Sequence, residues 1–556
     1  MATAAGNEPA SIKRETRLPG SGKLLILALD AANPALLRRW ADDGTLPNIA
    51  GLIARGLLAE TRSVDGLYVG ATWPSFYTAH DPSDHGIYWL DRIRPGSYWT
   101  YQCRARDLAA HPALWDVLSR AGRRVAVLDV PLTRISPELN GIQVVEWGVH
   151  DAAFGFRTRP RSLAREILAT VGRHPAPANC DARRSPEDYR RFAVQLVRGA
   201  QARGRLTREL LDAQDWDFAI QVFSETHCAG HQLWHFHDTS HPAFDAMATA
   251  ESGDLLRDVY AAVDAALGEI IAGVGAETTV VLLSLHGMSH ACGGSLLLPG
   301  ILERLEAAGA AEGGSPRRPT PAAGDSVGAR TGLGGALRRV YSRLPRGLRD
   351  RTWRLRSTIS RRLLRRETLL CPNPSAKSFV VGLGVGSTYS GIRLNLRGRE
   401  PQGVLAPGAE VERYCAELEA SLLAITRPES SVPLVRRVIR SRDRFAGPQA
   451  AILPDLLVEW EPEPPMGTSA AGIGGGAVWR AYSDAIGLIE KHNAYCRTGE
   501  HRIEGMMVGC GESIVPGRLD RSVSILDLAP TFARMLGCDM ASRDGKVVTE
   551  LLGAVR

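Results

Sequence analysis

Short apolar runs alternate with amphipathic stretches along most of this sequence of 556 residues. The runs are rich in Leu, Val and Ile, while the stretches between them repeat their apolar residues at helical spacing. Strands that alternate with helices in this way are typical of an α/β fold, with a mostly parallel central sheet flanked by helices. The predicted strands are residues 23–29, 124–130, 142–147, 218–223, 278–285, 378–383, 391–396, 455–460 and 504–508, and the predicted helices are residues 34–40, 162–171, 188–211, 255–271 and 525–536.

Polar residues follow several of the predicted strands directly. Asp30 ends the first run, residues 224–231 follow the run at 218–223, and His286 follows the run at 278–285. The carboxyl ends of parallel strands meet at one edge of a sheet, where α/β proteins place their functional groups. We therefore expect these residues to share one site.

Histidine is the most informative residue type in this chain. Five of the fourteen histidines lie between residues 224 and 241, and His227 and His231 are four positions apart. That spacing places both imidazoles on one face of a helix, an arrangement that suits one divalent ion. Histidines on a polar helix surface are also common, so the spacing by itself leaves both interpretations open.

Other candidate residues have a structural explanation as well as a chemical one. Asp30 is either a metal ligand or the N-cap of the next helix. Thr72 is either a nucleophile whose pKa a metal lowers, or a structural residue capping a helix that Pro74 opens. His286, before a glycine, and His501, before a short strand, are weak signals one at a time. Together these residues form the inventory of a metal-assisted hydrolase.

Composition is that of a globular protein and excludes a disordered, collagen-like or fibrous chain. Hydrophobic residues make up 44% and charged residues 23% of the sequence. No apolar run reaches the ~20 residues that span a bilayer, and residues 1–17 lack the apolar stretch of a secretory signal. The nine cysteines are scattered and form no CxxC pair. We therefore expect reduced thiols and a cytoplasmic protein.

The net charge of +7 is concentrated in one segment. Between Arg338 and Arg366 there are twelve arginines and one acid, Asp350, so this segment carries +11 and the rest of the chain −4. We therefore expect no nucleic-acid-binding body. The segment is interpreted either as a solvated insertion or, because Trp353 and several Leu and Ile accompany the arginines, as a contact for an anionic membrane or a polyanion.

Segment composition divides the chain into four parts. We expect residues 1–20 to be a flexible tail and residues 21–304 to be the first part of the α/β core. Residues 305–375 are a Gly/Pro-rich linker followed by the Arg-rich insertion, and residues 376–556 are the second part of the core.

In their order along the chain, the candidate residues resemble the motifs of the type I phosphodiesterase/nucleotide pyrophosphatase family of the alkaline phosphatase superfamily. The resemblance covers residues from about 23 to 553 and is specific as a set. Its parts are residues 25–31 (LILALDA, the opening strand), 72–86 (TWPSFYTAHDPSDHG, the nucleophile segment), 224–234 (SETHCAGHQLW, similar to TDxxxHxxW), 284–288 (SLHGM, similar to SDHGM), 391–403, 499–511 (the closing His segment) and 525–537 (the terminal helix).

The resemblance implies an alkaline-phosphatase-like fold with an insertion or cap segment, and a hydrolase of phosphate esters of the phosphodiesterase or nucleotide pyrophosphatase type. It implies one or two divalent metal ions, zinc first and manganese as a further candidate, and Thr72 as the catalytic nucleophile. By position, one ion would be held by Asp30, Thr72 and His286, and the other by His231 and His501 together with His227.

Two positions depart from the family pattern. Leu285 stands where the family has an Asp and cannot bind a metal, and His227 stands where it has another Asp. His227 can replace its carboxylate as a neutral ligand and complete a three-His site of the kind that zinc accepts in catalysis. Leu285 has no substitute unless Glu225 or His290 turns toward the site. Such a site should bind its second ion weakly, or only with an anionic substrate present.

These departures leave two hypotheses. The first is a phosphate-ester hydrolase with an altered metal site, and we favour it because Thr72 and Asp30 are retained. The alternative is a catalytically inactive alkaline-phosphatase-fold protein with a binding or regulatory role, which Leu285 suggests. Sulfatase or phosphonate hydrolase chemistry is less favoured, because those relatives use a Cys- or Ser-derived nucleophile in a different local pattern. The substrate and the oligomeric state stay open.

Overall fold

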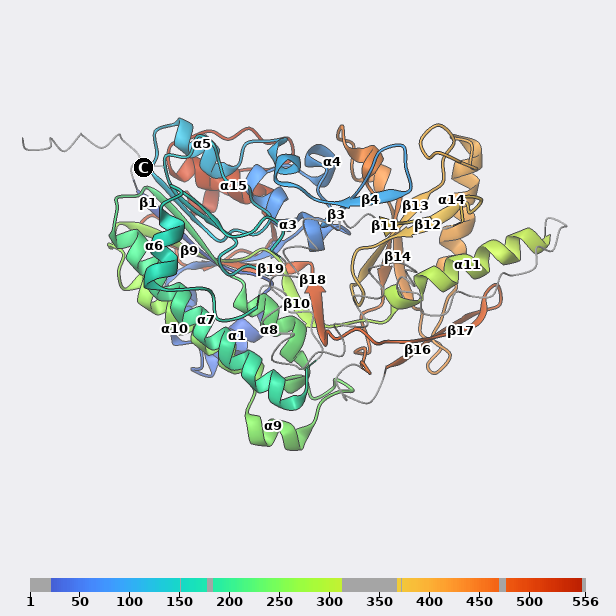
Figure 1. Ribbon diagram of the computed structural model, residues 1–556, viewed down its shortest axis with the longest axis horizontal. Helices are drawn as coiled ribbons and strands as arrows, with labels where there is room; N and C mark the ends of the chain where they lie inside the picture. Colours follow the sequence, from blue (N-terminus) through green and yellow to red (C-terminus); the bar gives the residue numbers. More distant parts are fainter. Residues whose placement is uncertain are drawn as a thin grey trace, which may run out of the picture.

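The computed structural model describes residues 22–150, 152–177, 184–312, 368–371, 373–469 and 477–552. Within these residues, a ten-stranded sheet forms the centre of the larger part of the molecule (Figure 1). Its order is β20-β2-β19-β9-β1-β8-β5-β6-β7, and β21 also pairs with β2. The strands are β1 (Lys23–Leu29), β2 (Leu57–Arg62), β5 (Val125–Leu128), β6 (Gly141–Val145), β7 (Arg157–Arg159), β8 (Phe218–Phe223), β9 (Thr278–Ser284), β19 (Glu504–Cys510), β20 (Gly517–Arg518) and β21 (Val523–Ser524).

The sheet is mostly parallel. β1 pairs in parallel with both of its neighbours, so that Leu25 lies opposite Ala219 of β8 and Val280 of β9. β5 pairs in parallel with β8 and β6. β19 is antiparallel to both β9 and β2, so β2 runs in the same direction as β9. The predicted α/β fold with a mostly parallel central sheet is confirmed.

Helices cover both faces of the sheet because its central strands are buried on both sides. Along β1, Leu25 and Leu27 join one apolar cluster, whereas Leu24 and Ile26 join another. The first face is covered by α1 (Pro34–Asp42), α2 (Pro47–Arg55), α6 (Leu163–Thr170), α7 (Pro186–Asp212), α8 (Glu225–Leu233) and α10 (Leu255–Ile271), and the second by α3 (Tyr68–Thr78), α5 (Leu114–Arg120) and α15 (Ile525–Met535).

A smaller part of the molecule has its own sheet and its own apolar cluster (Figure 1). Its strands follow the antiparallel order β12-β13-β15-β14, and Trp460 of β15 is fully buried in the cluster. The elements of this part are β12 (Ser378–Val381), β13 (Tyr389–Leu394), β14 (Val435–Arg440), β15 (Leu456–Trp460), α11 (Gly294–Glu312), α14 (Ala409–Leu423), and the hairpin of β16 (Val478–Ser483) and β17 (Gly487–His492).

Short elements complete the described structure. The two-stranded sheet of β10 (Gly287–His290) and β18 (Gly499–Arg502) lies with α8 near the middle of Figure 1, between the two parts. The remaining helices and strands are α4 (Pro82–His85), α9 (Ala246–Ser252), β3 (Asp91–Ile93), β4 (Trp99–Gln102) and β11 (Thr368–Leu369).

The predicted elements agree best where the chain is apolar throughout. β1, β8 and α10 have the predicted bounds. β2 was not predicted, because its buried residues alternate with partly buried or exposed ones and two of its side chains are charged. α11 continues past the predicted domain boundary at residue 304 to Glu312, and the chain returns to the large sheet only at β19. The rest of the predicted linker, from residue 313, and the Arg-rich segment lie outside the described residues.

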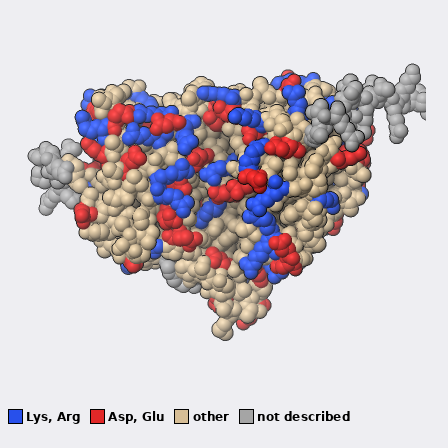
Figure 2. All heavy atoms as spheres, turned by 180° about the vertical axis from the view of Figure 1, so that it is seen from behind, with Lys and Arg blue, Asp and Glu red and all other residues tan. Residues whose placement is uncertain are grey.

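The surface and the thiols agree with the composition. On the face shown in Figure 2, basic and acidic side chains are intermingled rather than separated into fields of one sign. The eight cysteines in the described part of the chain are buried and form no disulfide with one another. Among the described helices, none is both long enough and apolar enough to span a membrane.

Candidate metal centre

The carboxyl ends of the parallel strands carry an unusual backbone. Ala31, Asp129 and Glu146 follow β1, β5 and β6, and their φ angles of 52°, 52° and 58° lie in the left-handed region. This conformation is uncommon for residues other than glycine and costs on the order of 1–3 kcal/mol each. Strain of this kind concentrates at functional sites. Three strained residues at the ends of strands in the same sheet therefore mark this edge as a candidate site.

Asp30 lies at this edge and is charged. Its Oδ1 accepts a hydrogen bond from Nε1 of Trp73 (2.9 Å), and its Oδ2 accepts one from Nδ1 of His227 (2.7 Å). Burial opposes the charge, but the interactions with His227 and His286 outweigh burial and lower the pKa of Asp30 to about 2. The alternative role as an N-cap is wrong, because Asn33 caps α1.

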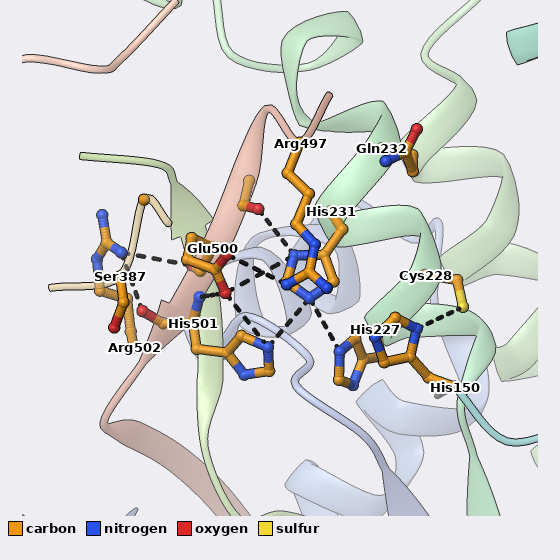
Figure 3. A network of polar contacts seen from close by, with 12 residues as sticks. His150, His227, Cys228, His231, Gln232, Ser387, Arg497, Glu500, His501 and Arg502 are labelled. Atoms are coloured by element: carbon orange, nitrogen blue, oxygen red, sulfur yellow. Dashed lines mark hydrogen bonds and ion pairs between the residues drawn. The ribbon is translucent and has the colours of Figure 1, made fainter. Parts of the chain in front are cut away.

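His227 and His231 share one face of α8, as their spacing predicts, and point toward each other (Figure 3). Nδ1 of His227 donates to Asp30, and Nδ1 of His231 donates to the carbonyl of Gly499 (2.8 Å). In a neutral imidazole only one nitrogen carries a proton. The two Nε2 atoms, 2.9 Å apart, therefore both present lone pairs to each other.

β18 adds two side chains that could bind a metal next to His231, namely His501 and Glu500. Nε2 of His501 lies 3.1 Å from Nε2 of His231, and its Nδ1 has no hydrogen-bond partner within the described residues. Oε1 of Glu500 lies 3.4 Å from Nε2 of His501, while its Oε2 pairs with Arg497 at 3.2 Å. His501 can donate one proton to His231, which still leaves the lone pair of His227 facing His231.

An additional proton could separate the facing lone pairs of His227 and His231 only at low pH. Burial lowers the pKa of His231 and His501 well below the ordinary value, and the charge of Arg497 lowers both further. Burial, followed by His150, also lowers the pKa of His227. A divalent cation would satisfy the same lone pairs, since zinc binds imidazole nitrogens at about 2.0–2.1 Å in a tetrahedron whose corners are roughly 3.3 Å apart. These side chains therefore fit a divalent metal, and the Nδ1 atoms of His227 and His231 are held by acceptors, as those of metal-binding histidines usually are.

The donors form two overlapping groups. The ligand atoms of His150, His227 and His231 lie within 4.8 Å of one another, and so do those of His231, Glu500 and His501. The three-His set expected from the sequence is thus divided between two groups that share His231. His150 and Glu500 were not predicted, although His150 follows a predicted strand and Glu500 precedes a candidate ligand, which are the available signals.

His286 lies two residues after β9 and packs against His501 of the same centre. Both of its ring nitrogens are buried without a hydrogen-bond partner in the described part of the chain. Its ring stacks on that of His501, with centroids 4.9 Å apart and planes 4° apart. Burial lowers the pKa of His286 to about 4, even though Asp30 acts in the opposite direction. A neutral, buried and unpartnered imidazole in this position is a suitable metal ligand.

Thr72 is in the body of α3, next to Ser63, which directly follows β2. Its hydroxyl donates to the carbonyl of Tyr68 and lies 2.6 Å from Oγ of Ser63, which is therefore the donor in that contact. Pro74 is inside α3, which begins at Tyr68, so the prediction that Pro74 opens this helix is wrong. The start of this helix was not recognised because its first turn contains Tyr68, Val69 and Gly70, which are weak helix formers.

The two residues considered as substitutes for the missing carboxylate are engaged elsewhere. Leu285 is buried in the apolar cluster on the α3 side of the sheet. Glu225 is held by Nε of Arg203 (3.1 Å) and Nε2 of His174 (2.8 Å). Nε2 of His290 contacts the carbonyl of Pro462 at 3.1 Å. Neither Glu225 nor His290 thus replaces the carboxylate of the family pattern.

The other histidines of the 224–241 region stabilise the fold instead. His235 contacts Thr498 (3.1 Å), His237 pairs with Asp254 (2.5 Å), and His241 accepts from the backbone of Ala243 (3.0 Å).

Comparison with known proteins identifies the family. The model of the family described as Type I phosphodiesterase / nucleotide pyrophosphatase matches residues 24–318. This is more than half of the chain and includes Asp30, Thr72, His227, His231 and His286. The chain therefore belongs to this family. Membership supports a hydrolase of the phosphoesterase or pyrophosphatase type, a class that is metal-dependent in general.

Individual proteins are more distant. No curated protein matches the chain. Phosphonoacetate hydrolase from Sinorhizobium meliloti 1021, solved in complex with phosphonoformate, is 16% identical over 93% of this chain and 96% of its own, with a TM-score of 0.48. An inactive variant of murine ectonucleotide pyrophosphatase/phosphodiesterase 5, solved in complex with AMP, is 10% identical over 94% and 97%, with a TM-score of 0.45.

Proposed function

We propose that this protein is a metal-dependent hydrolase of phosphate esters in which Thr72 is the nucleophile. The observation that carries the proposal is the opposed pair of lone pairs on His227 and His231, 2.9 Å apart and buried. Their outer nitrogens are fixed by Asp30 and by the Gly499 carbonyl. A divalent ion held there would supply Lewis-acid chemistry, polarising a phosphoryl oxygen and neutralising its charge.

Asp30 and the histidines hold this centre in place before substrate arrives. Asp30 fixes the tautomer of His227 and supplies negative charge behind it, which raises the basicity of a ligand. His286, with both ring nitrogens unpartnered, is proposed as a further ligand on the side of Asp30. Zinc suits the imidazole-rich donor set better than manganese does.

Thr72 would attack phosphorus with its Oγ1. As the bond from phosphorus to the ester's alcohol breaks, the proton of Thr72 would leave its hydrogen bond to the Tyr68 carbonyl and end on the departing alcohol. The hydroxyl of Ser63 would keep donating to Oγ1 and stabilise the negative charge that develops there. Burial of both hydroxyls excludes bulk water from the nucleophile until substrate is bound. The covalent phospho-enzyme is then cleared by water, as nucleophilic catalysis in two steps requires.

Thr72→Ala tests the role of the nucleophile, with Thr78→Ala as a matched control. Thr78 is buried in the same helix and donates in the same way to a carbonyl four residues earlier. With bis(p-nitrophenyl) phosphate as the probe, Thr72→Ala should lose at least about 10³-fold in kcat, whereas Thr78→Ala should keep its activity. Metal content should be equal in the two variants. Turnover that persists in Thr72→Ala would exclude Thr72 as the nucleophile.

The alternative is a catalytically inactive member of the family that binds a phosphate ester. It is favoured by Leu285, which is 1% exposed among apolar side chains where the family pattern has a metal-binding acid. This alternative predicts metal-loaded wild type with no turnover of bis(p-nitrophenyl) phosphate, p-nitrophenyl phosphate or a nucleotide diester. Turnover that disappears in Thr72→Ala would contradict it.

A further inference from the structure

His150 lies against the imidazoles of the metal centre but belongs to no motif of the family resemblance. Its ring centroid is 4.0 Å from that of His227 and 5.5 Å from that of His231. Its Nδ1 lies 3.6 Å from Sγ of Cys228 (Figure 3). Cys228 belongs to α8, as do His227 and His231. In the tautomer that carries its proton on Nδ1, facing this sulfur, His150 has an unprotonated Nε2. His150 can therefore offer a lone pair to the group that it forms with His227 and His231.

The segment that carries His150 is hydrogen-bonded to the buried ion pair of Asp129 and Arg203. Asp129 accepts from the backbone nitrogens of Trp147 and Gly148 (both 2.8 Å). Nη1 of Arg203 pairs with Asp129, and its Nη2 donates to the carbonyl of Gly148 (both 2.7 Å). A Cβ at Gly148 would lie 2.4 Å from this Nη2, so the close approach requires glycine.

Hydrogen bonds to Glu146 also fix the residues that follow His150 in the chain. The carboxylate of Glu146 accepts from the backbone nitrogens of Ala153 (2.7 Å) and Phe154 (2.8 Å). Arg203 is 1% exposed, and a buried cation costs several kcal/mol of desolvation that its partners only partly offset. A buried cation that costs free energy is expected where the position of a loop matters for function. The side chain that this loop places next to the centre is His150.

We propose that His150 is a protein ligand of the metal ion, which is held by the three imidazoles of His150, His227 and His231. The exchange of a carboxylate for His227 would then be accompanied by recruitment of a further imidazole from the loop after β6. The proposal rests on the proposed function only in that a metal ion binds at this centre. Three neutral imidazoles favour zinc, cobalt, nickel or copper, and disfavour magnesium and manganese, which prefer oxygen ligands.

Cobalt(II) provides a readout that does not depend on activity. Metal-free full-length protein would be titrated with Co²⁺ and followed by its visible ligand-field absorption, whose position and intensity report the ligands and their number. The variants are His150→Ala, His227→Ala, and His492→Ala as a control for the loss of an exposed imidazole far from the centre. Outer-sphere partners of metal ligands change affinity by about 10- to 100-fold. A direct ligand should exceed this, so we expect His150→Ala to bind Co²⁺ more than about 100-fold more weakly, with a shifted spectrum.

A second variant gives a positive signal if His150→Ala misfolds. His150→Cys, made in a Cys228→Ser background, should add thiolate-to-cobalt charge-transfer absorption in the near ultraviolet. Wild-type affinity and spectrum in His150→Ala, together with no such band in His150→Cys, would overturn the role of His150. If His227→Ala alone then abolished binding, the proposed metal centre would still stand. Absence of Co²⁺ binding by the wild type would overturn both the ligand role and the proposed function.

Discussion

The substitution Asp30→Asn tests how the centre fixes its ligands. An asparagine has the shape of aspartate but only one acceptor oxygen, whereas Asp30 accepts from both Trp73 (2.9 Å) and His227 (2.7 Å). If the amide oxygen remains on the indole, the amide NH₂ faces Nδ1 of His227. That imidazole must then accept at Nδ1 and carry its proton on Nε2, where it cannot bind a cation.

The size of this effect follows from the usual strength of such hydrogen bonds and of the partners of metal-binding histidines. Losing one charge-assisted hydrogen bond costs about 1.5–3 kcal/mol, and changes in partners of metal-binding histidines cost about 10- to 100-fold in affinity. We therefore expect Asp30→Asn to weaken zinc binding by roughly 10- to 100-fold, which is 1.4–2.8 kcal/mol, without changing the number of ions at saturation.

Competition with a chromophoric zinc chelator, together with elemental mass spectrometry at saturating zinc, measures both quantities. The control is Asp254→Asn, which changes a carboxylate that pairs with a histidine outside the centre at 2.5 Å. Unchanged zinc affinity in Asp30→Asn would refute the tautomer argument. Loss of one of two bound ions would show instead that Asp30 is a direct ligand.

Three further predictions concern Leu285, the buried Arg203 network and the buried His85. Leu285→Asp should raise the number of ions bound at saturating zinc, measured by elemental mass spectrometry, and an unchanged number would show that this position does not reach the centre. Arg203→Met should lower the free energy of unfolding, measured in urea titrations, by about 3–5 kcal/mol. The reason is that Asp129 and Glu225 stay buried without their cation. A loss below about 1 kcal/mol would contradict the importance of this network. Burial lowers the pKa of His85 to about 3, so the unfolded chain binds a proton there below pH ~6.5 and the folded chain does not. Stability should fall by about 2 kcal/mol from this group between pH 7.5 and pH 5, and His85→Gln should reduce that fall in urea titrations at the two pH values, whereas an equal fall in variant and wild type would contradict the argument.

Local pattern was sufficient for the elements that are apolar on all sides. β1, β8 and α10 have their predicted bounds, and the spacing of His227 and His231 was enough to place them on one face of α8. β2 could not be recognised in this way, because an alternating strand near the sheet edge with polar side chains has no apolar run.

The role of individual site residues depended on contacts that no spacing encodes. The hydrogen bonds of Asp30 depend on where Trp73 and His227 meet it in space. His150 lies in an irregular segment whose position is set by Arg203, more than fifty residues later in the chain. Long-range contacts of this kind leave no periodic signal in the sequence.

The most direct test of the account is the metal content of the purified full-length protein, determined by elemental mass spectrometry with and without orthovanadate as a phosphate analogue. We expect near-stoichiometric zinc, retained after dialysis and lost in the double variant His227→Ala/His231→Ala. A folded wild-type protein that takes up no divalent metal under either condition, even when zinc is supplied, would contradict the proposed hydrolase.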